Sequence, residues 1–468
     1  MTTQRFTPEF KEEAVRQIVE RRYSVSELSA RVGVSAHSLY KWVNALASGC
    51  VEIHQLLTLM KKSPFRQVNC PAPTVGTLRA RAALFASLTV LLAAWGGGSN
   101  ASEKSPAPAP AQSINAALGA PDRLLGGLGA GNAISDMTSQ QINPDIIDTY
   151  LVGVGPGSWP YWNSPDGAYV TYVSANDKAI GAVPMFTLYQ MATNGEADMT
   201  PVNDVTFMTT YWSQAKLMYQ KIGATGQPTL VNLEPDFWGF VQSKSGGDPT
   251  KVPARVSMVT ECAGQPDTAV GIAGCLLTLG RTYAPKAKLG FPPSFWGQDA
   301  TSVGNFMAKV GADKADFIVA QTSDRDAGCF EMASPVAECA GRGNGPFYWD
   351  ESNATSPNFS DSLAQWSTTR SIVGKLPILF WQTPMGVPST TPGGTPGHFR
   401  DNHVHYMLTH ATQYTAICVF AIVFSGGGST SANITTDGGE FARLFQSYLA
   451  NPAPYQCDQL FYSGFEGP

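Results

Sequence analysis

The fold of this chain is indicated most clearly by residues 229–239, which read TLVNLEPDFWG. The stretch is a short apolar run that ends in a carboxylate, Glu234, and is closed by proline and aromatic residues. Helical patterns precede it at 204–222 and follow it at 252–283. A buried strand with helices on both sides is typical of βαβ units, which build parallel sheets.

The same alternation extends over residues 118–452. Further strands are expected at 151–155, 182–188, 287–291, 316–321, 376–382 and 416–424. Further helices are expected at 299–310, 361–373, 402–412 and 439–449. Seven strands over this length favour a (β/α)8 TIM-type barrel, whose eighth strand is either 346–349 or a segment without a clear pattern. An open doubly wound sheet is the rival, but its glycine-rich turn should lead into a helix, and Gly153, Gly155 and Gly157 lead into Ser-Trp-Pro.

The composition separates a basic head from an acidic body. The 468 residues are 43% hydrophobic and 14% charged, as in a globular protein. Residues 1–81 hold 12 Lys and Arg against 6 Asp and Glu, which leaves 19 against 30 for the remainder. The head could tolerate nucleic acid, whereas the body would be repelled by it, so the two parts are expected to have different partners.

Residues 1–46 have the pattern of a small all-α helix-turn-helix segment. Ser24 and Glu27 form a capping box, and Gly33 allows the turn before the next helix. The segment, from RFTPEFKEEAV to GVSAHSLYKWV, closely resembles the helix-turn-helix of insertion-sequence transposase small subunits. The resemblance implies that these residues bind DNA: Arg21, Arg22, Arg31, His37, Ser38, Tyr40 and Lys41. Nothing downstream resembles the rest of a transposase, so this segment is interpreted as a vestige fused in frame or translated from a start codon placed too early.

A signal-peptide-like segment follows at 79–98. Arg79 and Arg81 precede the apolar run 82–94, which is too short to span a bilayer but fits the core of a secretion signal. Trp95 stands where a bacterial lipoprotein signal would have its lipid-bearing cysteine. Recognition of this signal would place the body in the periplasm or outside the cell. A signal that is not recognised would leave the chain in the cytoplasm.

Three segments without a fold of their own are expected around these parts. Residues 47–78 are interpreted as a junction, residues 99–117 as a Pro/Ala linker, and residues 453–468 as a C-terminal tail. The barrel itself is expected at 118–452, with no stable transmembrane span. The sequence leaves the oligomeric state open.

The cysteines suggest an oxidising compartment. Six of them follow the signal: Cys262, Cys275, Cys329, Cys339, Cys418 and Cys457. An even number behind an export signal predicts disulfides, and the short loops favour Cys262–Cys275 and Cys329–Cys339. Cys418 lies in an apolar run, which also fits a buried free thiol. No CxxC pair occurs, so metal binding by cysteine is not expected.

Aromatic residues and carboxylates gather where the expected strands end, at the rim that carries the active sites of barrel enzymes. Aromatic rings stack on the apolar faces of sugars, so a carbohydrate site is predicted at this rim. Its expected substrate-binding residues are Trp159, Tyr161, Trp162, Trp238, Trp296, Trp381 and Gln382. Each aromatic taken alone could equally pack a loop.

Glu234 is the first candidate for a catalytic acid, because burial near an aromatic residue would raise its pKa and keep it protonated. Asp324 is the expected nucleophile or base, with Asp326 and Asp236 as alternatives. The pair Asp324 and Asp326 could instead be a structural loop around Arg325, or a calcium loop. The spacing of the two carboxylates would decide between retention and inversion, and the sequence does not give it.

Residues 145–450 resemble secreted bacterial glycoside-hydrolase-like barrel proteins. The segments that carry the resemblance are LEPDFWGF, TSDRDAG, LFWQTP, GHFRDNHVHY and TTDGGEF. The resemblance implies a (β/α)8 barrel that acts on a poly- or oligosaccharide by carboxylate chemistry, without a cofactor. The chain departs from many such barrels at Leu233, where they have asparagine directly before the acid.

Two further functions stay open. One is a non-catalytic carbohydrate-binding barrel at the cell surface. The other is DNA binding by residues 1–46. The histidines at His398, His403, His405 and His410 could join in a metal site, but a helix at 402–412 would turn His403 and His405 apart, so no metal is expected.

Overall fold

The computed structural model describes residues 113–129, 132–191, 195, 197–322, 349–386, 403–425, 432–455 and 457. The expected helix-turn-helix, junction and signal lie outside the described residues, as do Asp324 and Asp326. The described residues belong to a compact unit that spans Ala111–Pro468. Helix α5 (Ile114–Leu118) begins inside the expected linker, because Ser113 caps it and Ile114 and Leu118 bury their side chains.

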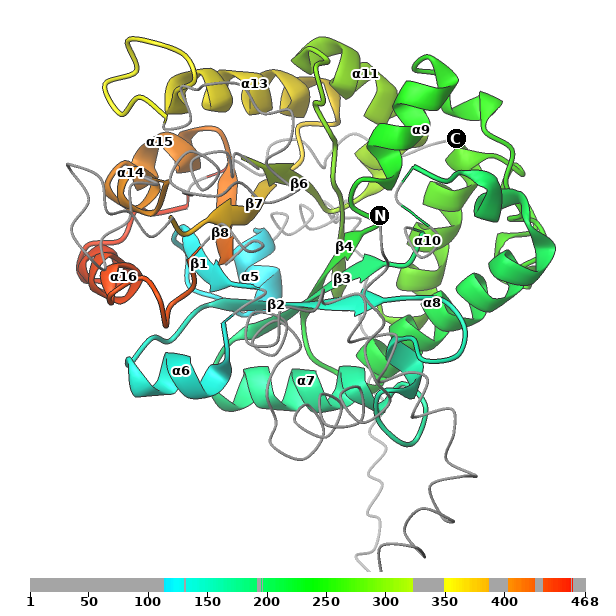
Figure 1. Cartoon of the computed structure of the whole chain (residues 1–468), viewed down its shortest axis with the longest axis horizontal. Helices are drawn as coiled ribbons and strands as arrows, with labels where there is room; N and C mark the ends of the chain where they lie inside the picture. Colours follow the sequence, from blue (N-terminus) through cyan, green and yellow to red (C-terminus); the bar gives the residue numbers. More distant parts are fainter. Residues whose placement is uncertain are drawn as a thin grey trace, which may run out of the picture. The chain divides into compact units, whose positions relative to one another are not determined.

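Eight parallel strands close into a barrel in chain order, which confirms the predicted fold. Figure 1 shows the strands in the centre of this unit with helices around them. The strands are β1 (Leu125–Leu128), β2 (Ile146–Val152), β3 (Val183–Tyr189), β4 (Thr229–Leu233), β5 (Ala287–Phe291), β6 (Phe317–Gln321), β7 (Ile378–Pro384) and β8 (Val419–Ser425). Each pairs with the next, and β1 pairs with β8.

The eighth strand is β1, so of the two alternatives the structure bears out a segment without a clear pattern rather than residues 346–349. Its sequence, LGGL, carries two glycines in four residues and therefore shows no apolar pattern. The glycines are needed because the strand is crowded on both faces. A Cβ on Gly126 would lie 2.2 Å from Phe445, and one on Gly127 would lie 2.9 Å from Val423.

Helices cover the outside of the barrel. They are α6 (Ile134–Ser139), α7 (Ala168–Ala179), α8 (Val205–Thr225), α9 (Phe237–Ser245), α10 (Ala269–Tyr283), α11 (Ala300–Val310), α13 (Phe359–Ile372), α14 (His403–Thr409), α15 (Ala411–Ala416) and α16 (Glu440–Ala450). Single 3₁₀ turns are η1 (Trp159–Tyr161), η2 (Thr200–Asn203), η3 (Pro249–Lys251), η4 (Thr260–Cys262) and η5 (Ala312–Lys314). No helix among the described residues combines the length and apolar character needed to cross a membrane.

Two of the predicted helices are shorter than expected. The helix at 252–283 is reduced to α10, because its first part forms the loop that Pro253 and Thr268 close with a β-bridge. The helix at 402–412 is divided at His410 into α14 and α15.

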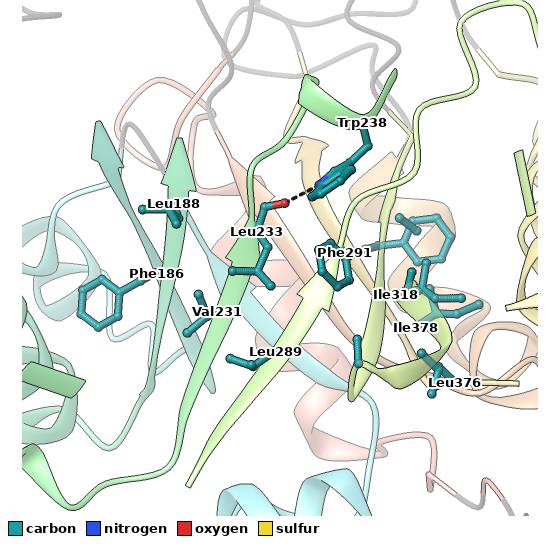
Figure 2. Close-up of a cluster of buried hydrophobic side chains, with 14 of the residues drawn as sticks. Phe186, Leu188, Val231, Leu233, Trp238, Leu289, Phe291, Ile318, Leu376 and Ile378 are labelled. Carbon is teal, nitrogen blue, oxygen red and sulfur yellow. Dashed lines mark hydrogen bonds between the residues drawn. The ribbon is translucent and has the colours of Figure 1, made fainter. Parts of the chain in front are cut away.

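The core has two layers, as the alternation of strand side chains requires. The outer layer fills the space between strands and helices, and part of it is drawn in Figure 2, where Leu188, Val231 and Phe291 lie with Trp238. The inner layer fills the barrel and includes Leu125, Ile146, Met185, Leu230, Val319 and Leu379. The barrel is therefore packed at its amino-terminal end, and only its carboxyl-terminal mouth can hold a ligand.

Two disulfides lie in the described part of the chain. Cys262–Cys275 confirms the prediction from loop length. Cys418, for which a buried free thiol was the alternative, is bonded to Cys457, because the tail returns to the barrel. Pro454 forms an antiparallel bridge with Arg123, and Tyr455 is buried in the inner layer. Cys329 and Cys339 lie outside the described residues.

Replacing Cys418 and Cys457 together by serine is expected to destabilise the oxidised protein by about 3–4 kcal/mol. The bond closes a 39-residue separation, and cross-linking a loop of this length removes that much entropy from the unfolded chain. Urea unfolding of the full chain measures the loss. The difference from the unmodified protein should disappear in reductant, and equal stability of the two oxidised proteins would contradict the prediction.

Candidate functional site at the barrel mouth

A buried carboxylate, Asp148, points into the barrel from β2 and accepts hydrogen bonds from β3 and β7. It lies on β2 two residues after Ile146, which points into the barrel. Its oxygens accept hydrogen bonds from the Thr187 hydroxyl at 2.7 Å and from the Trp381 indole N–H at 2.8 Å. Because β2 and β7 are not neighbours, the bond to Trp381 passes through the barrel interior. The Asn232 amide donates to the Thr187 hydroxyl at 3.3 Å and extends this polar layer to β4.

Burial raises the pKa of Asp148 to about 6, although the hydrogen bonds from Trp381 and Thr187 favour its charged form. The carboxyl therefore titrates close to neutrality. A group whose charge changes in this range can exchange a proton with a ligand at ordinary pH.

An aromatic layer lies above Asp148. The Tyr150 ring is 5.8 Å from the Trp381 ring and meets the Tyr189 ring edge-on at 6.0 Å. The Gln382 amide donates a hydrogen bond to the Tyr150 hydroxyl. The Tyr189 hydroxyl donates to Asp236 at 3.2 Å. Tyr150, Tyr189, Asp236 and Gln382 are all half-buried, so this layer is open to a ligand.

These residues are called the mouth cluster below. Its members are Asp148, Tyr150, Thr187, Tyr189, Asn232, Asp236, Trp381 and Gln382. Two of them have left-handed backbone conformations that ordinary residues rarely adopt: Asp236 with φ 66° and Gln382 with φ 50°. Such strain costs free energy and is concentrated in proteins at functional sites. Asp236 follows β4 and Gln382 lies within β7, so this strain falls on two polar residues of the mouth cluster.

Glu234 is not a member of the mouth cluster. Its side chain is fully buried, and one oxygen accepts hydrogen bonds from the backbone N–H groups of Gln190 and Met191, both at 3.0 Å. The Tyr211 hydroxyl, on α8, lies near the Glu234 carboxylate and favours its charged form, but the two groups do not form a hydrogen bond. Glu234 therefore lies between the sheet and α8 and does not face a ligand in the mouth. Its predicted role as catalytic acid stays a prediction.

Burial raises the pKa of Glu234 to about 8. The protonated carboxyl is the form that fits the site, so its contribution to stability is complete below the ordinary pKa of 4.5 and is lost as the pH rises through 8. Glu234→Gln removes this titration and still offers an oxygen to the two N–H groups.

We therefore expect Glu234→Gln to change stability little at pH 5 and to make the protein more stable than the wild type at pH 9, by about 3 kcal/mol. Urea unfolding of both proteins at the two pH values measures the difference. The other buried acids titrate equally in both proteins, so they cancel in the comparison. The same free-energy difference at pH 5 and pH 9 would contradict the prediction.

The other predicted residues fall into three groups. Trp159 and Trp238 are fully buried in the outer core and have no face for a ligand, so the structure gives them a packing role. Tyr161, Trp162 and Trp296 are 51%, 38% and 49% exposed. Asp324 and Asp326, together with the seven predicted DNA-binding residues, lie outside the described part of the chain.

The sequence reasoning missed Asp148, Tyr150 and Tyr189. The signal was present, because Asp148 and Tyr150 alternate with apolar residues in IIDTYLV. A polar side chain in the inward register of a strand marks a polar layer inside the barrel. The strand was instead expected at 151–155, which begins after both residues.

No three His, Cys, Asp or Glu side chains of the described residues gather as a metal site would require. His403 is buried, with its ring 4.7 Å from that of Trp349. His405 pairs with Glu351 at 3.1 Å. His410 stacks on Tyr406, and His398 lies outside the described residues.

The head of the chain is similar to known transposase proteins. The family model described as Transposase, HTH_Tnp_1, matches residues 1–55, which extends past the boundary expected at residue 46. A protein of Escherichia coli strain K12 whose name describes it as a transposase, YkgN, is 44% identical over 43 residues. That match covers 9% of this chain and 38% of the relative, so the chain spans little more than a third of that protein.

Solved structures similar to this chain include several (β/α)8 glycoside hydrolases. The GH113 β-mannanase of Alicyclobacillus acidocaldarius is 8% identical, with a TM-score of 0.39 over 70% of this chain and 98% of that one. An endo-β-1,4-mannanase of Cellulomonas fimi is 11% identical, with a TM-score of 0.42 over 73% of each chain. A GH26 β-mannanase of Bacteroides ovatus is 11% identical, with a TM-score of 0.38 over 74% of this chain and 95% of that one.

Proposed function

We propose that the barrel mouth binds a poly- or oligosaccharide and hydrolyses its glycosidic bond by carboxylate chemistry. The observation that carries the proposal is the pairing of an accessible carboxylate, Asp236, with Tyr189 above a second carboxyl, Asp148, that titrates near neutrality. Glycoside hydrolysis requires acidic groups of this kind on a site with aromatic walls. Tyr150 and Tyr189 supply those walls, while Trp381, only 2% exposed, packs against Tyr150.

The proposal gives Asp236 the role of the carboxylate that meets the substrate. Its partner is Asp148 or, as predicted from the sequence, Asp324 or Asp326. Asp324 follows Gln321, the last residue of β6, by three positions in the sequence. In this proposal Glu234 positions Tyr189 and Asp236. It accepts hydrogen bonds from the backbone that follows Tyr189, and it precedes Asp236 by two residues.

The test is the release of reducing ends by the full chain from a panel of polysaccharides and oligosaccharides with α and β linkages. Hydrolysis of at least one of them is expected. Proton NMR of the first product then shows whether the anomeric configuration is retained or inverted, which decides whether the partner carboxylate acts as nucleophile or as base. A chain that neither binds nor cleaves any member of the panel would contradict the proposal.

A non-catalytic saccharide-binding barrel is the second candidate. The observation that favours it is the full burial of Glu234, which removes the first predicted acid from the mouth. Binding to a saccharide of the panel without any release of reducing ends would support this candidate over hydrolysis.

Export is part of the proposal. The two disulfides are typical of proteins that fold in oxidising compartments, which agrees with a signal at residues 79–98 and a mature barrel in the periplasm or outside the cell. Mass spectrometry of the mature N-terminus from an export-competent host tests this. A secreted product that begins near residue 99 is expected.

DNA binding is proposed for residues 1–46 wherever that segment is retained, because residues 1–55 match the transposase model. Salt-dependent retardation of a DNA duplex by the full chain, lost when Arg21, Arg22 and Arg31 are replaced, is the expected result.

A further inference from the structure

A groove separate from the mouth cluster lies between α9 and α11. It has a volume of about 570 Å³, within the range of roughly 300–1,000 Å³ typical of small-molecule sites. One wall is a face of α9 at positions 239, 242, 243 and 246, and the other is a face of α11 at positions 302, 305, 306 and 309. Both sets have the spacing of a single helix face. The loop after β5 closes one end with Trp296.

The ring of Trp296 is exposed in the groove, where a ligand could stack on it. Its ring is 49% exposed, and its edge contact is with Phe240 at 4.7 Å. Its backbone is left-handed, with φ 28°, a strained conformation for a bulky residue. A Cβ on Gly239 would lie 2.7 Å from the ring, so this glycine gives the ring room to lie against α9.

Apart from Lys309, the polar side chains that line the groove are neutral amides and hydroxyls, and one of them, Ser302, donates a hydrogen bond to Asp299. Within the described part of the chain, the side chains of Gln242, Ser294 and Asn305 make no hydrogen bond, although Gln242 and Ser294 are buried. Among the described residues that line the groove there is no carboxylate, and the one cation, Lys309, donates to the Gly247 carbonyl at 3.4 Å. These groups are therefore available to form hydrogen bonds with a ligand in the groove.

An exposed indole face beside amide and hydroxyl groups fits a neutral sugar ring, which is apolar on its face and bears hydroxyls around its edge. Trp296 also lines a smaller cavity of about 170 Å³ with Gln321 and Thr322, where β6 ends. The same residue therefore borders both the groove and the rim of the barrel. We propose that the groove between α9 and α11 is a second binding site, for a neutral saccharide chain. The class of ligand rests on the proposed function, but binding in the groove does not require catalysis.

The test is affinity electrophoresis of the full chain in gels that contain hydroxyethyl cellulose, galactomannan, laminarin or soluble starch. Retardation by at least one of these neutral polymers is expected. Trp296→Ala should weaken that binding about tenfold, since it removes the stacking face. Asn305→Trp, which places a bulky side chain on the α11 wall of the groove, should weaken it as well. Tyr172→Ala removes an exposed aromatic from α7 and is the matched control, with unchanged binding.

Reducing-end release is measured on the same variants. The binding proposal for the groove and the hydrolysis proposal for the mouth can therefore be contradicted independently. If the wild-type protein shows no hydrolysis but binding is lost in the Trp296 and Asn305 variants, the result supports the binding site in the groove and contradicts catalysis at the mouth. The groove proposal would be overturned if both variants bound every retarding polymer as tightly as the wild type does. It would also be overturned if none of the polymers retarded the wild-type protein. Thermal unfolding confirms that each variant is folded.

Discussion

Replacing Asp236 by asparagine is expected to lower kcat for the saccharide that the protein cleaves by roughly 10²–10⁴-fold, with little change in KM. Asparagine keeps the shape of the side chain and can still accept the hydrogen bond from Tyr189, but it can neither carry negative charge nor transfer a proton. Initial rates of reducing-end release by the purified full chain measure the effect.

Glu234→Gln is the matched control, because it makes the same change two residues earlier on a buried side chain. Its kcat should fall by less than about tenfold if Glu234 only positions the end of β4. The reverse outcome, a large loss in Glu234→Gln and none in Asp236→Asn, would return the acid role to Glu234 and contradict the role proposed for Asp236.

Replacing Trp238 by alanine is expected to destabilise the protein by about 3–5 kcal/mol. The indole is fully buried where α9 begins, meets Phe291 edge-on at 5.2 Å and donates to the Leu233 carbonyl at 2.8 Å (Figure 2). Its removal leaves a cavity and an unsatisfied carbonyl at the end of β4. Urea unfolding measures the loss.

Tyr172→Ala serves again as the control, because this ring is 59% exposed and its loss should cost about 0.5 kcal/mol or less. A Trp238→Ala protein as stable as this control would show that the indole is not a core residue. The sugar-stacking role predicted for Trp238 from the sequence would then be open again.

The strands were predictable because a buried parallel strand leaves a continuous apolar run in the sequence. The run at 287–291 coincides with β5 and most others lie within two or three residues of their strands, but the run at 151–155 shares only its first two residues with β2. Strand β1 could not be recognised in this way. Its glycines are required by contacts with Phe445 and Val423, which are about 300 residues distant in the chain, and a local pattern does not carry that information.

The mouth was predictable in its location but not in its residues. Alternation along β4 points Leu230 into the barrel, and Asn232 and Glu234 follow in the same register. The left-handed backbone at Glu234, with φ 55°, breaks this alternation and turns the carboxylate toward α8. A second left-handed residue, Asp236, then becomes the accessible acid of the loop. Single reversals of this kind depend on tertiary contacts, in this case with the N–H groups of Gln190 and Met191.

The sequence also could not decide which aromatic residues pack in the core and which are exposed to a ligand. Trp159, Trp238 and Trp296 all follow strand ends next to proline or glycine, yet the first two are buried and the third is exposed. The difference lies in which helix packs over each ring, and that is set by elements distant in the chain.

The central claim is that the mouth cluster is where a saccharide is held and cleaved. A crystal structure of the Asp236→Asn full chain with an oligosaccharide of its own substrate tests this most directly. We expect a sugar ring against Tyr150 or Tyr189, with its glycosidic oxygen within hydrogen-bond distance of residue 236. An empty mouth in crystals whose protein binds the same oligosaccharide elsewhere would contradict the claim.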